Sequence, residues 1–272
     1  MTVSLVQIQP TRQRLDCRGL LPARLAQMSI TEIQRLPLRA GNRRIPLAEL
    51  FTVEHDQDGV TALNLKTLDN HLDYLGADLA EGRMEIVGDA GDFAGRAMLG
   101  GELLVHGDCA DYAGSGLSGG TLSIRGNAGH CVGGPGAGER QGQRGGVIHL
   151  RGNAGERAGE RMRRGKLIIE GDVGRLLGYR MIAGTIYAAG RVAERAGYDM
   201  RRGTLLLNQL PHSISPTLRA NGRHTLPFLH LLIEDLQQSA DGRLKLPPSP
   251  TSVTRFLGDT AAGGRGEMLI IS

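Results

Sequence analysis

The chain of 272 residues contains no tryptophan, and its five tyrosines and four phenylalanines make up only 3% of the sequence. A platform that stacks the bases of single-stranded nucleic acid needs aromatic side chains, so this composition argues against that function. No apolar run approaches the roughly 18 residues of a membrane-spanning helix. The N-terminus also lacks the basic-then-apolar order of a secretory signal. We therefore expect a cytoplasmic protein that binds neither nucleic acid nor a membrane.

Cysteine is scarce, with three residues and no CxxC spacing, so we predict neither a disulfide framework nor a metal site. Glycine, in contrast, is abundant at 41 residues, about twice the usual share. These glycines do not follow the every-third-residue spacing of collagen. The apolar content of 40% excludes a disordered chain. We expect a core of aliphatic side chains packed against glycine-rich turns.

Lysine is nearly absent, with three residues, and the positive charge of the arginines is concentrated in the middle of the chain. Residues 120–203 carry 15 basic and 7 acidic groups, whereas residues 1–119 carry 11 and 16, and residues 204–272 carry 6 and 5. A basic middle favours an acidic partner or ligand. Solvated surface arginines without any partner explain the same pattern equally well.

A 19-residue repeat governs the middle of the sequence. Glycines precede short apolar runs at positions 82, 101, 120, 146, 165, 184 and 203. A second set follows those runs: Gly88, Gly107, Gly126, Gly152, Gly171 and Gly190. Every step is 19 residues except one of 26, which places an insertion of seven residues within 133–146. The apolar runs alternate with period two, which indicates half-buried strands that end in Gly-Asp or Gly-Asn turns.

The length of the repeat restricts the fold. Nineteen residues are too few for a strand–helix–strand unit of about 30 residues, and the signature of leucine-rich repeats is missing. We therefore predict an all-β fold, a right-handed parallel β-helix of about seven 19-residue coils with small α/β caps at both ends. Equivalent residues would stack, and the resulting core column is expected to contain Met98, Met162, Met181 and Met200.

The same reading divides the chain into three domains: an N-terminal cap (1–61) with a strand, a short helix and a hairpin, a β-helix (62–208), and a C-terminal cap (209–272). Ser29-Ile-Thr-Glu32 is a capping box that would start the short helix. Strands are expected at 51–55 and 60–65, joined by a turn at 56–59.

The C-terminal cap is expected to contain one helix and an extended tail. Residues 227–238 form an amphipathic pattern with a proline in the first turn, which predicts the helix. The tail at 240–272, which includes Pro247-Pro248-Ser249-Pro250, is expected to run along a surface.

The sequence contains no recognisable catalytic arrangement. The glycine fingerprint at 114–119 lacks the following helix that dinucleotide binding requires, and residues 159–167 miss the spacing of a phosphate-binding loop. His106 and His149 occupy outward strand positions at different offsets, so we expect both on the surface. The Asp and Asn residues that follow the second glycines are expected to cap turns. We predict no catalytic, cofactor-binding or metal-binding residue in this chain.

Six arginines are candidates for docking an acidic partner or ligand: Arg161, Arg163, Arg164, Arg180, Arg201 and Arg202. The pair at 163–164 and the pair at 201–202 share one repeat offset two units apart, so they should recur after roughly 10 Å on one face. In the intervening unit this offset holds Ile182-Ala183. The face therefore mixes apolar and cationic groups, as interfaces do.

The repeats GDAGDFAGRAMLGG, GNAGERAGERMRRG and GDVGRLLGYRMIAG resemble the G-x-x-G-x-x-x-G repeats of the glutamate synthase C-terminal β-helix. They are more similar still to the glycine-repeat subunit of formylmethanofuran dehydrogenase, which has a bacterial counterpart in the formyltransferase/hydrolase complex. Residues 72–114 and the tail RFLGDTAAGGRGEMLIIS (255–272) carry this resemblance. The helix that starts at Ser29 and the LPL at 36–38 also fit it.

The resemblance implies a non-catalytic scaffold subunit in an enzyme complex. The bacterial complex moves a formyl group from tetrahydromethanopterin to a methanofuran-type carrier and releases formate. Its other chains are implied to be amidohydrolase-like with zinc, formyltransferase and pterin-subunit-like. The arginines could then meet a neighbouring subunit or a glutamate-rich tail of the carrier.

Arginine-rich, lysine-poor usage favours the bacterial complex. Two alternatives of the same descent stay open: a tungsten or molybdenum formylmethanofuran dehydrogenase, whose pterin metal lies in another subunit, and a glutamate synthase-like amidotransferase-associated domain. A carbohydrate-active β-helix enzyme is the third alternative, and it would require acidic residues clustered on one outer face.

Overall fold

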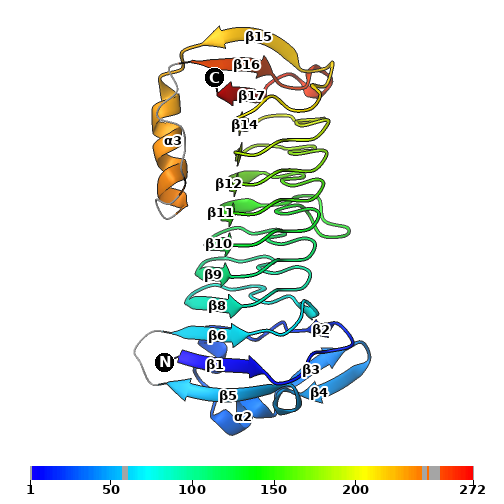
Figure 1. Ribbon diagram of the computed structural model, residues 1–272, viewed down its shortest axis with the longest axis vertical. Helices are drawn as coiled ribbons and strands as arrows, with labels where there is room; N and C mark the ends of the chain where they lie inside the picture. Colours follow the sequence, from blue (N-terminus) through cyan, green and yellow to red (C-terminus); the bar gives the residue numbers. More distant parts are fainter. Residues whose placement is uncertain (1, 57–60, 241–243, 245–251, 272) are drawn as a thin grey trace.

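The computed structural model describes residues 2–56, 61–240, 244 and 252–271. Thirteen strands form one sheet along the long axis of the molecule, and a four-stranded sheet lies at the N-terminal end (Figure 1). The order in the large sheet is β15-β16-β17-β14-β13-β12-β11-β10-β9-β8-β6-β1-β5, and in the small sheet β4-β3-β2-β7.

The repeat region supplies seven neighbouring strands of the large sheet. They are β8 (Arg83–Val87), β9 (Glu102–Val105), β10 (Thr121–Ile124), β11 (Arg144–Leu150), β12 (Arg164–Ile169), β13 (Thr185–Ala188) and β14 (Thr204–Leu207). Each strand pairs in parallel with the strand of the next repeat unit. Glu102 lies opposite Thr121, for example, and Thr121 lies opposite Val147, so the register follows the sequence steps of 19 and 26 residues.

Alternate residues of these strands point into the interior. Met84, Leu103, Leu122, Ile148 and Leu167 occupy equivalent positions, and none of them exposes more than 1% of its surface. The loop segments of the units add a second set of fully buried side chains: Leu79, Met98, Leu117, Met162, Met181 and Met200. The core therefore extends through every unit from one end of the molecule to the other.

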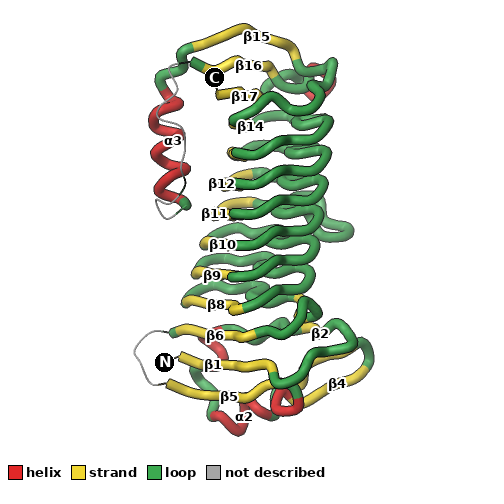
Figure 2. Tube along the Cα trace, in the orientation of Figure 1, coloured by secondary structure: helices red, strands yellow, loops and turns green. Residues whose placement is uncertain are grey.

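The fold class predicted from the sequence, an all-β right-handed parallel β-helix of about seven coils, is wrong. The strands form a large mixed sheet, mostly parallel, and the chain ends add helices, which is an α/β-type arrangement. Each repeat unit contributes one short strand, and most of its remaining residues are loops and turns (Figure 2). Elsewhere the described units meet through isolated bridges, such as Ala90 with Cys109 and Ala154 with Val173. Single bridges do not make the further continuous sheets that enclose a β-helix.

Glycines after the strands lie where neighbouring units come closest. A Cβ atom on Gly126 would lie 2.6 Å from the carbonyl oxygen of Gly107, and a Cβ on Gly107 would lie 2.6 Å from that of Gly88. Gly152, Gly171 and Gly190 have the carbonyl of the preceding glycine in the same position. The spacing between units therefore leaves no room for a side chain at this offset.

We expect Gly126→Ala to lower the free energy of unfolding by about 2–3 kcal/mol, because the backbone of the adjoining unit cannot retreat to make room. Gly138→Ala is the matched control, since Gly138 has a positive φ of 80° but no atom within 4 Å of the added Cβ. That control carries only the strain of a left-handed alanine, about 1 kcal/mol. Equilibrium urea unfolding measures both. Equal losses in the two variants would show that close approach at Gly126 is unimportant.

The turn after each strand is held by a ladder of side chains. Asp89 Oδ1 accepts a hydrogen bond from the backbone N–H of Asp108 at 2.8 Å, and Asp108 Oδ1 accepts one from Asn127 at 2.7 Å. The ladder continues through Asn153 and Asp172 to the N–H of Arg191. The prediction that these residues cap turns is confirmed, and each caps the turn of the following unit.

The N-terminal segment contains β1 (Thr2–Gln7), β2 (Leu15–Asp16), α1 (Pro22–Leu25), α2 (Ile30–Gln34), β3 (Pro37–Ala40), β4 (Arg43–Pro46), a 3₁₀ turn (Leu47–Glu49), β5 (Phe51–Asp56), β6 (Ala62–Lys66) and β7 (Leu72–Asp73). The capping box at Ser29 and Glu32 forms as predicted.

β5 and β6 form where strands were predicted, but they do not pair with each other. β1 lies between them, antiparallel to β5 and parallel to β6, so the hairpin predicted here is wrong. The turn expected at 56–59 lies largely outside the described residues.

The C-terminal segment contains β15 (Arg219–His224), α3 (Phe228–Ser239), β16 (Val253–Leu257), a 3₁₀ turn (Thr260–Ala262) and β17 (Glu267–Ile271). The helix predicted at 227–238 is confirmed, and it covers the outer face of β12–β14 (Figure 1). Leu229, Ile233 and Leu236 pack there in one cluster with Tyr187 and Leu206.

The tail predicted to run extended along a surface instead returns to the large sheet. β17 pairs in parallel with β14, with Glu267 opposite Thr204, and thus occupies the position of a further repeat strand. Its side chains Met268 and Leu269 are fully buried. The strand gains this burial because β14 would otherwise leave an open sheet edge. The proline run at 247–250 lies outside the described residues.

Candidate functional site

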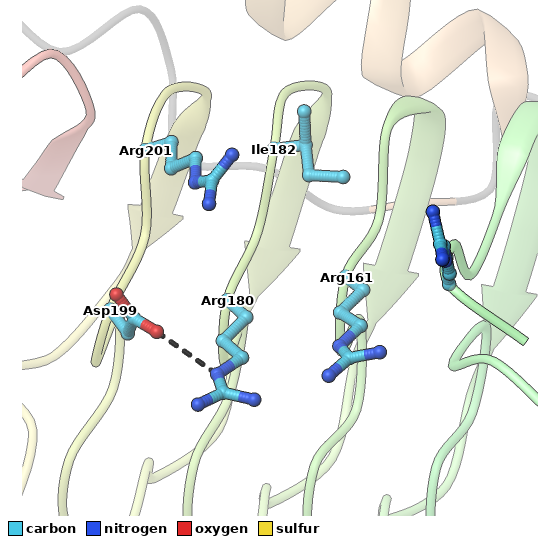
Figure 3. A pocket seen from close by; sticks show the side chains of 6 residues that line it. Arg161, Arg180, Ile182, Asp199 and Arg201 are labelled. Carbon is cyan, nitrogen blue, oxygen red and sulfur yellow. Dashed lines mark hydrogen bonds and ion pairs between the residues drawn. The ribbon is translucent and has the colours of Figure 1, made fainter. Parts of the chain in front are cut away.

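A groove of about 360 Å³ crosses the turns of three consecutive repeat units (Figure 3). The residues that line it are Arg140, Arg161, Arg180, Ile182, Asp199 and Arg201. We call it the arginine groove. Four guanidinium groups and one carboxylate give its lining a formal charge of +3.

One side of the groove is a row of residues at the same repeat offset. Arg161, Arg180 and Asp199 succeed one another at 19-residue steps, and all three have left-handed backbones, with φ values of 49°, 54° and 58°. The N–H groups of Arg161 and Arg180 donate to the carbonyls of Tyr179 and Tyr198 in the following unit, at 2.8 and 3.0 Å. These bonds between units hold the strained backbone and fix the spacing of the side chains.

The charges in this row are partly compensated. Arg180 Nε donates to Asp199 Oδ2 at 2.9 Å, the contact drawn in Figure 3. Arg161 Nη1 donates to the carbonyl oxygen of Glu139 at 3.4 Å, and its Nε lies 3.8 Å from Glu160 Oε1. Arg140 and Arg201 have no ion-pair partner among the described residues. Two of the four guanidinium groups are therefore free to take an anion.

The opposite side of the groove carries Ile182 and Arg201 on neighbouring units (Figure 3). The N–H groups of these residues donate to the carbonyls of Met162 and Met181, both at 2.8 Å. An apolar side chain beside a free guanidinium suits a ligand that has both an acidic group and an aliphatic segment.

The structure brings together only half of the six arginines that the sequence analysis selected. Arg161, Arg180 and Arg201 line the groove. Arg163 instead contacts Gln141 Oε1 through Nη1 at 3.3 Å, and Arg164 opens strand β12 opposite Arg144. Arg202 is exposed and is not among the residues that line the groove.

Arg140 was missed by the sequence analysis. It belongs to the insertion at 133–146, so it has no repeat offset and the periodic search passed over it. The signal that could have found it was the pair of basic residues, Arg140 and Arg144, within that insertion.

A second pocket, of about 340 Å³, lies on the other side of the inserted loop and shares Arg140 with the groove. Its lining includes Ser115, Glu139 and Arg144. Burial raises the pKa of Glu139, but hydrogen bonds from Arg96 Nη2 and the Gly136 N–H, together with the charges of Arg96 and Arg144, outweigh burial and lower it overall. The carboxylate stays ionised and holds the loop against Arg96.

Other chemistry-bearing side chains are dispersed. In the described part of the chain, no three His, Cys, Asp or Glu side chains gather where they could hold a metal ion. All three cysteines are free and buried, and burial raises the pKa of the Cys17 and Cys109 thiols. None of the helices in the described ranges has the length and hydrophobicity that crossing a bilayer requires.

His149 does not lie on the surface as the sequence analysis expected. It is 97% buried, and its Nε2 lies 2.7 Å from Glu170 Oε1. His106 is half-buried and contacts Glu85 Oε1 through Nε2 at 2.6 Å.

Comparison with known proteins gave one informative result. No family model matches the chain, and no curated protein matches it. Among solved structures, the chain is similar to a chain of the formyltransferase/hydrolase complex from Methylorubrum extorquens in complex with methylofuran. The two chains are 32% identical, the match covers 99% of each, and the TM-score is 0.89.

Proposed function

This chain belongs to the family of the formyltransferase/hydrolase complex chain that it matches, and we propose that it is the non-catalytic scaffold, the glycine-repeat subunit, of such a complex. The observation that carries the proposal is similarity along the whole chain rather than in one segment. The dispersal of acids, histidines and cysteines among the described residues agrees with a scaffold.

In this proposal the complex acts in the cytoplasm on one-carbon units. It transfers a formyl group from tetrahydromethanopterin to a methanofuran-type carrier and releases formate. The reacting groups and the zinc belong to amidohydrolase-like, formyltransferase and pterin-subunit-like chains. The match favours this complex over a tungsten or molybdenum dehydrogenase and over a glutamate synthase-like domain.

The arginine groove is our proposed docking site for an acidic group of a neighbouring subunit or of the carrier. Support comes from the two guanidinium groups of Arg140 and Arg201 that lack ion-pair partners in the described ranges, and from Ile182 beside them. A basic cleft concentrates anions by long-range attraction, so the groove would speed the encounter as well as hold the partner.

The proposal is tested by purifying the full chain alone and together with the other subunits. We expect the chain to elute with large partner chains in fixed ratio, and the isolated chain to show no hydrolase, transferase or redox activity and no stoichiometric metal. Formate release and elemental analysis provide the measurements. One zinc, iron, tungsten or molybdenum per isolated chain would contradict the scaffold assignment.

A further inference from the structure

A separate basic pocket lies on the outer face of the large sheet. It has a volume of about 130 Å³ and is lined by Arg83, Leu104, Ser123, Ile124, Arg125, His149 and Arg151. These residues come from β8, β9, β10 and β11 or directly follow those strands. Nothing in the arginine groove is shared with this pocket.

The pocket lies where one row of side chains changes from apolar to polar. Leu206, Tyr187 and Ile168 lie opposite one another on β14, β13 and β12, and α3 covers them. The row continues on β11 and β10 as His149 and Ser123. A polar row on a sheet face needs hydrogen-bond partners of its own, since it lies beyond the residues that pack against α3.

Two of the pocket's donors have no partner within the described ranges. The guanidinium of Arg151 makes no hydrogen bond or ion pair there, and the hydroxyl of Ser123 makes no hydrogen bond. Both lie beside the buried imidazole of His149. A ligand with several oxygen atoms would satisfy both groups.

Arg125 is held in place by a chain of polar contacts. Its Nη1 donates to His106 Nδ1 at 2.9 Å, and His106 Nε2 in turn lies 2.6 Å from Glu85 Oε1. Because Nδ1 accepts in this arrangement, Nε2 carries the proton and donates to Glu85. Arg83 Nη2 lies 3.7 Å from Glu85 Oε2. The two nearby carboxylates, Glu85 and Glu170, thus each hold a histidine, and neither is among the described residues that line the pocket.

From this arrangement we propose that the pocket binds a small tetrahedral oxyanion, phosphate or sulfate, through Arg83, Arg125, Arg151 and the Ser123 hydroxyl. Donors on four strands or strand ends suit an anion with oxygens in several directions better than a planar carboxylate. The volume accommodates one such group and little more. The source is either the free ion or the phosphoryl group of a small ester.

The test uses the full chain in chloride buffer, with inorganic phosphate, sulfate, glycerol phosphate and acetate as probes. Isothermal titration calorimetry measures affinity, and the thermal midpoint measures stabilisation, which rises with ligand that binds only the folded state. We expect saturable phosphate binding at roughly 1 mM or tighter, competition by sulfate, and no comparable acetate binding. Glycerol phosphate distinguishes the sources, since it binds only if the pocket admits an ester.

Arg125→Gln and Arg151→Gln are each expected to weaken phosphate binding at least about tenfold, since each removes a charge-assisted hydrogen bond. Arg219→Gln, on the exposed strand β15, is the control and should leave affinity unchanged. Ser123→Ala, a small change on the sheet face, should weaken binding several-fold and serves if an arginine variant fails to fold. Absence of saturable phosphate binding, equal acetate binding, or unchanged affinity in the pocket variants would overturn the proposal.

Discussion

Replacing Met181 by aspartate is expected to prevent folding, whereas Met181→Leu is expected to cost less than about 1.5 kcal/mol. Met181 is fully buried, and the equivalent residues Met162 and Met200 are fully buried in the units on either side. An aspartate there would place a charge in the core without a partner, and such burial costs several kcal/mol or more. Leucine keeps nearly the same volume and apolar character.

The effect of the aspartate would not stay local. The side chain of Met181 reaches the next unit, because a Cβ atom on Gly203 would lie 2.7 Å from Met181 Cε. Far-UV circular dichroism and thermal melting of the purified variants measure the outcome. A soluble Met181→Asp chain that melts cooperatively near the midpoint of the unmodified chain would show that this column does not carry the core.

Reversing the charge of the arginine groove is expected to weaken assembly or carrier use by roughly tenfold or more at low salt, with little change in the melting temperature. The variant changes Arg140, Arg161 and Arg201 to glutamate, and leaves Arg180 in its ion pair with Asp199. The difference from the unmodified chain should shrink as salt rises, because ions screen exposed charges.

The matched control changes Arg163, Arg164 and Arg202 to glutamate, which alters the net charge by the same amount outside the groove. Assembly is followed by size-exclusion chromatography with the partner subunits, and carrier use by formate release at two salt concentrations. The docking proposal fails if the groove variant assembles and turns over like the unmodified chain. It also fails if both triple variants lose function equally, since net charge alone would then explain the effect.

The register of the repeat units could be predicted from the sequence because its cause is local. A residue such as Gly126 meets the backbone of the preceding unit wherever the unit stands in the chain, so the requirement for glycine recurs at each step. The ladder from Asp89 to Asp172 recurs for the same reason. Periodicity therefore identified which residues are equivalent.

Periodicity did not reveal which segments join into sheets. The alternation in residues 83–87 indicates a strand, but nothing at Ala90 or Cys109 distinguishes an isolated bridge from a continuous ladder. The positions of β1 and β17 depend on pairing across about 60 residues, which no local pattern encodes. For these reasons the fold class and both chain ends were predicted incorrectly.

The candidate sites show the same division. Arg161 and Arg180 were found because their offset repeats, whereas Arg140 stands on the insertion and has no offset. The burial of His149 follows from neighbours on other strands, Leu104 and Ser123 among them. Charge and spacing alone therefore selected the correct face for some arginines, and only the paired strands define the pockets.

The pairing of β14 with β17 has a consequence for the dimensions of the molecule. β17 adds to β14 in the register of one more unit, and β6 adds to β8 with the same parallel geometry. Duplicating or deleting one 19-residue unit would leave both junctions unchanged and alter the distance between the two ends by about 4.8 Å. The chain can thus act as a ruler graduated in whole units, which would set how far apart proteins bound at its two ends are held.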